Sequence, residues 1–155
     1  MVNSAGYEFD ENARIVRVDT SRLANLEDSL ALSQRLVHDS RIPLDAGFII
    51  DLRAMRHLLQ FDEIYQLMDW HKGRGLQFKG RFAFLVDRPA TVGTANIFCT
   101  LLHLHAIEAD MFDSDELALA WLSKSPRSSG EFARSVESGG VTQEVVDVEV
   151  AAGAR

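Results

Sequence analysis

The alternation of short apolar runs with helical patterns is the feature that most constrains how this chain folds. Residues 48–52 and 82–86 are short, largely apolar runs of the kind found in strands that are buried on both faces. A helical spacing of apolar residues follows each run, at 61–72 and at about 91–105. Strands that alternate with helices pair in parallel through right-handed crossovers. The sequence therefore predicts an α/β fold with a mostly parallel sheet and flanking helices.

The chain on either side of this region extends the same pattern. Residues 7–10 and 15–19 flank a polar pair suited to a tight turn, which predicts an opening β-hairpin. A helix is expected over 26–39, with Asn25 as its N-cap.

A short last strand and a final helix are predicted at 109–122. The strand, 109–112, runs directly into a helix whose first turn is capped by Asp113 or Ser114. The stripe of this helix that faces inward is expected to consist of Leu117, Ala120 and Trp121.

Length and composition predict one domain. The chain has 155 residues, of which 46% are hydrophobic, and this is enough for a single core. We expect the domain to span 7–124, after an N-terminal extension at 1–6. Ser, Gly and charged residues are frequent after the last helix, so 125–155 is predicted to be a mobile C-terminal tail. Within the tail, 141–150 has a strand-like alternation that suits pairing with a sheet edge.

Charge and cysteine usage argue against several classes of protein. The formal net charge of -7 argues against attraction to nucleic acid or anionic membrane, which favour an excess of Lys and Arg. No window approaches the roughly 18 to 20 consecutive apolar residues of a membrane-spanning helix. Cys99 is the single cysteine, so the chain cannot form an internal disulfide. We expect a cytoplasmic protein that has no membrane span and does not bind nucleic acid.

Three segments carry a resemblance to a known family. They are the opening hairpin, the run Phe48-Ile-Ile-Asp-Leu-Arg53 and the closing stretch Met111–Leu122. On these segments the chain resembles the STAS-like family, which is related to sporulation anti-sigma-factor antagonists and to lipid-carrier domains. The resemblance implies a four- or five-stranded sheet flanked by helices. It also implies a non-enzymatic domain that binds a partner protein or a small apolar or nucleotide ligand.

One position departs from that family. In the classical anti-sigma antagonists, the partner kinase phosphorylates a Ser of an Asp-Ser pair at the start of the helix after the central strand. This sequence has Leu59-Gln60-Phe61-Asp62 there, without a hydroxyl group. The resemblance therefore implies a branch without this phosphorylation switch.

Ligand-binding side chains are expected where parallel strands end, because crevices form outside their carboxyl ends. Asp51 and Arg53 end the first apolar run, and Asp87 ends the second. Asp51 is the best single candidate, and the alternative is that it caps a loop by accepting from a nearby backbone amide. At the start of the third helix, near Thr91 and Thr94, free backbone amides could hold an anion. The alternative there is ordinary capping by Thr91.

Structural roles are expected for the remaining chemistry-bearing residues. His103 and His105 point away from each other on a helix and have no third ligand at a recognised spacing, so no metal site is expected. Cys99 lies in an apolar helix, which raises the pKa of a thiol and makes it unreactive. A set of aromatic residues could line an apolar cavity but is more often plain core: Phe61, Tyr65, Phe82, Phe84, Phe98, Phe112 and Trp121.

These observations favour a non-catalytic STAS-like domain that binds a protein partner or a second copy of itself, without a cofactor. The alternative is a carrier of a small apolar or anionic ligand, with Asp51, Arg53 and the start of the third helix near the mouth of its pocket. A lipid-type ligand would need an enclosed void on the order of a few hundred Å3. A third alternative, a hydrolase or transferase with Asp51 or Asp87 as base, lacks a nucleophile in the sequence.

Overall fold

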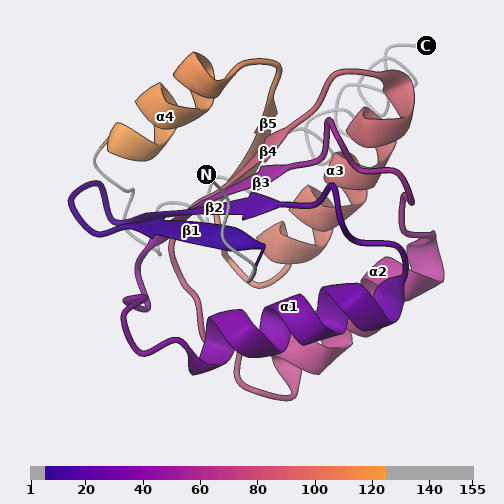
Figure 1. The fold of residues 1–155 in the computed structure, drawn as a ribbon, viewed down its shortest axis with the longest axis horizontal. Coiled ribbons are helices and arrows are strands. Elements are labelled where there is room, and N and C mark those ends of the chain that lie inside the picture. Colours follow the sequence, from indigo (N-terminus) through magenta and orange to yellow (C-terminus); the bar gives the residue numbers. More distant parts are fainter. Residues whose placement is uncertain (1–5, 125–155) are drawn as a thin grey trace, which may run out of the picture. The chain divides into compact units, whose positions relative to one another are not determined.

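The computed structural model describes residues 6–124, which form an α/β fold with helices on both faces of a five-stranded sheet (Figure 1). The strands are β1 (Tyr7–Asp10), β2 (Ile15–Asp19), β3 (Gly47–Asp51), β4 (Phe82–Leu85) and β5 (Ala109–Phe112). The helices are α1 (Leu26–His38), α2 (Phe61–Lys72), α3 (Pro89–His103) and α4 (Asp115–Ser123). The predicted tail, its strand-like segment 141–150 and all of the predicted extension except Gly6 lie outside the described residues.

The strands lie in the sheet in the order in which they occur in the chain. β1 and β2 form the predicted hairpin and are antiparallel, whereas β2, β3, β4 and β5 pair in parallel. The sheet is therefore mixed, and the expectation of a mostly parallel sheet holds from β2 onward.

The helices divide unequally between the two faces of the sheet. Each parallel crossover moves one strand further in the same direction, so right-handed connections place α1, α2 and α3 on one face. The last helix, α4, follows the final strand and packs on the other face, against β4 and β5 (Figure 1). We call these the three-helix face and the α4 face.

Alternating side chains of the central strands fill the two layers, as the period of two along a strand requires. Phe48 and Phe84 point toward the three-helix face and pack with α1, α2 and α3. Ile49, Ala83 and Leu85 point the other way and pack with α4. The main core therefore lies under three helices, and a smaller one lies under α4.

Local signals in the sequence set the starts of the helices. The Asn25 side chain accepts a hydrogen bond of 2.9 Å from the Asp28 amide and caps α1, which confirms the prediction. At α2, the Glu63 carboxylate accepts from the Gln60 amide at 2.9 Å. The Ser114 hydroxyl caps α4, so Ser114 and not Asp113 has this role.

The predicted inward stripe of α4 is correct for Trp121 and wrong for Leu117 and Ala120, which are exposed. Leu117 is 55% exposed, and the residues that face the sheet are Ala118, Trp121 and Leu122. Leu and Ala alternate around this helix, so the apolar pattern alone does not define a face. The small side chain of Ala118, which is fully buried, permits the helix to approach the sheet closely.

The third helix begins and ends two residues earlier than predicted. Pro89 occupies its first turn, where a missing N–H has no intrahelical partner to lose. The chain turns after His103. Ala106 then adopts a left-handed conformation with a φ of 58°, in which a right-handed helix cannot continue.

Candidate functional site

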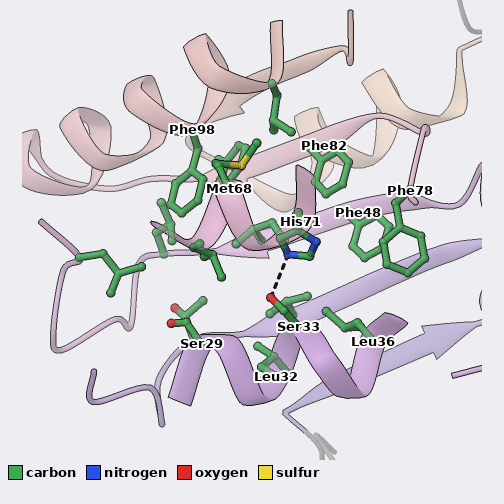
Figure 2. A pocket seen from close by; sticks show the side chains of 18 of the residues that line it. Ser29, Leu32, Ser33, Leu36, Phe48, Met68, His71, Phe78, Phe82 and Phe98 are labelled. Atoms are coloured by element: carbon green, nitrogen blue, oxygen red, sulfur yellow. Dashed lines mark hydrogen bonds between the residues drawn. The ribbon is translucent and has the colours of Figure 1, made fainter. Parts of the chain in front are cut away.

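A cavity of about 130 Å3 lies between the sheet and the three-helix face (Figure 2). Its walls come from β2, β3 and β4 on one side and from α1, α2 and α3 on the other. Ile50 and Phe82 lie on the central strands beneath the helices and yet keep accessible surface, because they border this space. Among the described residues, this cavity is the best candidate for a binding site.

Aromatic and aliphatic side chains form most of the wall. The ring of Phe48 stacks on Phe82 with centroids 4.7 Å apart and lies 4.9 Å from that of Phe78. Phe84 and Phe98 stack in the same way at 5.4 Å, and both line the cavity. The lining therefore favours an apolar occupant.

One pair of polar side chains meets within this apolar wall. The imidazole Nε2 of His71, in the last turn of α2, lies 3.0 Å from the hydroxyl of Ser33, in the middle of α1 (Figure 2). Both residues line the cavity, and Ser33 is buried. The pair joins α1 to α2 within the helical wall of the cavity.

The other polar groups of the wall donate to backbone carbonyls. The Thr20 hydroxyl donates to Asp51, and the Gln77 amide donates to Val37 at 3.2 Å. The Ser29 hydroxyl points to the Asn25 carbonyl at 3.5 Å, the outer limit for such a bond. Of these lining groups, His71 and Ser33 are the ones that bond to another side chain.

The cavity is uncharged at neutral pH. Burial lowers the pKa of His71 to about 4, and the nearby Arg74 charge acts in the same direction. No Asp, Glu, Lys or Arg is found among the described residues that line it. An ionic ligand would therefore lose its hydration without gaining an opposite charge.

The predicted site residues Asp51 and Arg53 belong to a different cluster, on the α4 face. Arg53 donates to Asp51 from its backbone amide at 3.1 Å, from Nε at 3.0 Å and from Nη2 at 2.9 Å. Arg17 lies 3.5 Å from Asp51, and both arginines also pair with Asp115 in the first turn of α4. The alternative role of Asp51, capping the loop after β3 through the Arg53 amide, is thus present in the structure.

These contacts keep both carboxylates of the cluster ionised. Burial acts to raise the pKa of Asp51, but hydrogen bonds from Arg53 outweigh it and the pKa is lowered. At Asp115 burial is likewise outweighed by hydrogen bonds from Arg17 and Arg53. Neither carboxylate has the raised pKa that suits a general base at neutral pH.

The remaining predicted site residues organise the start of α3. The buried Thr91 hydroxyl accepts from the amides of Asp87 and Arg88, each at 3.1 Å, and so has the capping role that was the alternative. Asp87 is exposed and pairs with the Arg88 guanidinium at 3.0 Å. Thr94 is buried one turn further along α3.

None of the five predicted site residues lines the cavity. Ser33 and His71 were not predicted as site residues, although both lie on the apolar stripes of their helices, where a polar residue is itself a signal. Of the aromatic set, Phe82, Phe84 and Phe98 line the cavity. Phe61 and Tyr65 are instead 61% and 52% exposed.

Cys99 and His103 lie in the environments described next. Cys99 is buried as expected, and burial raises the pKa of its thiol to about 12. His103 bonds to the Ala109 carbonyl at 2.8 Å. Residues 6–124 contain no cluster of three or more potential metal ligands. Within the same range, no helix combines the length and apolar character that a bilayer crossing requires.

Comparison of the chain with protein-family models, with curated proteins and with solved structures found no match. Function is therefore inferred from the geometry of the cavity and its lining.

Proposed function

We propose that this domain is a non-catalytic binding protein that holds a small, mainly apolar molecule between its sheet and its three-helix face. The cavity carries this proposal. Its lining is apolar and uncharged, and its volume of about 130 Å3 far exceeds the space of one water molecule. The resemblance to lipid-carrier members of the STAS-like family favours the same function.

The volume sets the size of the ligand. An engineered apolar cavity of about 150 Å3 in another protein binds benzene. A cavity of about 130 Å3 therefore suits one ring or a chain of about six carbons. This is smaller than the void that a lipid-type ligand requires, so we propose a small volatile or aromatic molecule rather than a phospholipid.

A catalytic role for the Ser33 and His71 pair is less well supported. Ser33 lies in the middle of α1, where backbone N–H groups bond within the helix and leave no oxyanion hole. No carboxylate among the described lining residues orients the imidazole. With its pKa lowered to about 4, His71 is also a weak base.

Methyl NMR with benzene and n-hexane as probes tests the proposal. Ile50 lines the cavity, whereas its neighbour Ile49 points to the α4 face. We expect a saturable shift of the Ile50 methyl signals and no shift at Ile49. If neither probe shifts Ile50 up to its solubility limit, the proposal is wrong.

A filling variant gives a second, independent result. Ile50→Phe places a ring in the cavity and is expected to abolish the response of Val18, another lining residue. Ile97→Phe is the matched control, because Ile97 packs on the same core without lining the cavity. Far-UV circular dichroism of both variants verifies that they fold.

A second proposed function is docking of a partner protein or a second copy through α2. Phe61 and Tyr65 are exposed neighbours on this helix, with ring centroids 6.2 Å apart. Exposed aromatic residues are enriched at protein interfaces. Light scattering of the wild type and of Phe61→Ala/Tyr65→Ala tests self-association. If the wild type and the variant are both monomeric, self-association through α2 is wrong.

A cytoplasmic location is also proposed, on the basis of the single buried Cys99 and the negative net charge.

A further inference from the structure

We infer that the Ser33 and His71 pair is a polar anchor that selects neutral, hydroxyl-bearing apolar ligands over carboxylates and amines of the same size. This inference rests on the proposed function, because it assigns the head group of a ligand that the cavity holds. The pair lies in the wall of the cavity, where a ligand can reach it. Figure 2 shows the imidazole of His71 among the lining side chains, with Ser33 beside it at 3.0 Å.

The pair keeps hydrogen-bonding capacity that a ligand can use. A neutral imidazole has one donor and one acceptor, and a hydroxyl has one donor and two acceptor positions. When His71 donates to Ser33, the serine hydroxyl is free to donate to a ligand. When Ser33 donates to His71, its oxygen still accepts. A ligand hydroxyl, which both donates and accepts, suits either arrangement.

The other polar side chains of the wall are directed to backbone carbonyls. The Thr20 hydroxyl donates to the Asp51 carbonyl, and the Gln77 amide donates one of its two N–H groups to the Val37 carbonyl. The Ser29 hydroxyl points to the Asn25 carbonyl. Aromatic and aliphatic groups surround the pair. A ligand with one hydroxyl group and an apolar body thus matches one polar pair in an apolar wall.

Charge discriminates against ionic head groups. A carboxylate only accepts hydrogen bonds and an ammonium only donates, and the described lining supplies neither a cation nor an anion. His71 stays neutral at pH 7, since its pKa is lowered to about 4. Both ionic classes would be desolvated without compensation.

Four probes with the same six-carbon chain separate these alternatives at pH 7: n-hexane, 1-hexanol, hexanoate and hexylammonium. We expect 1-hexanol to bind at least tenfold more tightly than either ion, measured by titration of the Ile50 methyl signals. The dissociation constant of n-hexane reports on the cavity alone.

The variants then test the anchor itself. Ser33→Ala should weaken 1-hexanol about fivefold, the equivalent of one net hydrogen bond, and leave n-hexane unchanged. Ser123→Ala is the matched control, because it removes a hydroxyl group from α4, which does not line the cavity. It should change neither affinity. His71→Phe, which keeps a ring and removes both nitrogens, should act like Ser33→Ala on 1-hexanol.

The outcomes distinguish the inference from the proposed function. If n-hexane binds but hexanoate or hexylammonium equals 1-hexanol, the anchor is wrong and the apolar site stands. The same conclusion follows if Ser33→Ala and His71→Phe weaken n-hexane and 1-hexanol equally. If none of the four probes binds, the proposed function fails, and the anchor fails with it.

Discussion

The guanidinium of Arg53 lies 3.1 Å from a carboxylate oxygen of Asp115, although the two residues are 62 positions apart in the chain. This contact joins the end of β3 to the first turn of α4. Ala118 is fully buried where α4 meets the sheet, and the partly buried Trp121 and Leu122 pack beside it. The ion pairs of Asp115 with Arg53 and Arg17 add a polar attachment at the start of the helix.

Asp115→Ala is expected to lower the free energy of unfolding by about 1 kcal/mol, as loss of a partly exposed ionic network does. Glu116→Ala is the matched control, since it removes a carboxylate from the same first turn. Urea unfolding of both variants measures the difference. In about 1 M salt the difference should shrink, because the Debye length is then about 3 Å. Equal losses at low salt would contradict a role for the network.

Val18 and Val16 offer a test of the cavity that needs no ligand. Both are buried on the same face of β2, but only Val18 lines the cavity. Val18→Ile adds a methylene group to open space and should be neutral or stabilising by up to about 1 kcal/mol. Val16→Ile adds it to packed core and should destabilise by about 1 to 3 kcal/mol. Thermal and urea unfolding measure both changes, and similar losses would argue against the cavity.

The stability of the domain should fall as the pH drops from 7 to 5. Below pH 6.5 the histidine of the unfolded chain binds a proton, whereas folded His71 does so only near pH 4. The unfolded state therefore binds more protons in this window, and acidification favours it by roughly 2 kcal/mol at pH 5. The carboxylates of Asp51 and Asp115, whose pKa values are lowered, keep their stabilising effect throughout this range.

His71→Phe should remove this dependence, which urea unfolding at several pH values between 5 and 7 will show. The measured quantity is the difference between the wild type and the variant, so other histidines cancel. Parallel curves for the two proteins would mean that His71 is not buried in a neutral form.

Gly80 and Gly93 are expected to respond in opposite ways to substitution by alanine. A β-carbon on Gly80 would lie 2.0 Å from the carbonyl oxygen of Ala46, in a backbone that cannot move aside easily. Gly80→Ala should therefore cost about 3 kcal/mol or more. A β-carbon on Gly93, inside α3, meets nothing within 4 Å. Gly93→Ala should stabilise by about 0.5 to 1 kcal/mol, and urea unfolding compares the two.

The order and type of the elements could be predicted because each has a local signal. The helix over 26–38 is set by its Asn25 cap and apolar spacing, and β3 by an apolar run. The side on which each helix packs is not local. It depends on strand order, which the alternation of strands and helices leaves open. The face of α4 was predicted correctly only for Trp121, because Leu and Ala surround the helix and tertiary contact through Ala118 decides which side faces the sheet.

The candidate site was harder to predict than the fold. The rule for strand ends located Asp51 and Arg53, but it cannot show that they would pair with each other and with Arg17. A void is a property of the packed structure, and the residues around it look like ordinary core in the sequence. The polar members of the apolar stripes, Ser33 and His71, were the available signal.

The wall of the cavity begins at Val18 and ends at Ile107, and it draws on three strands and three helices between them. No single segment forms the cavity, so the cavity exists only after the last of these elements has packed into the fold. Any molecule held there binds the complete domain and not its unfolded chain, and each bound molecule raises the global stability by mass action. The free energy of unfolding of the domain therefore increases with the fraction of molecules whose cavity holds a ligand.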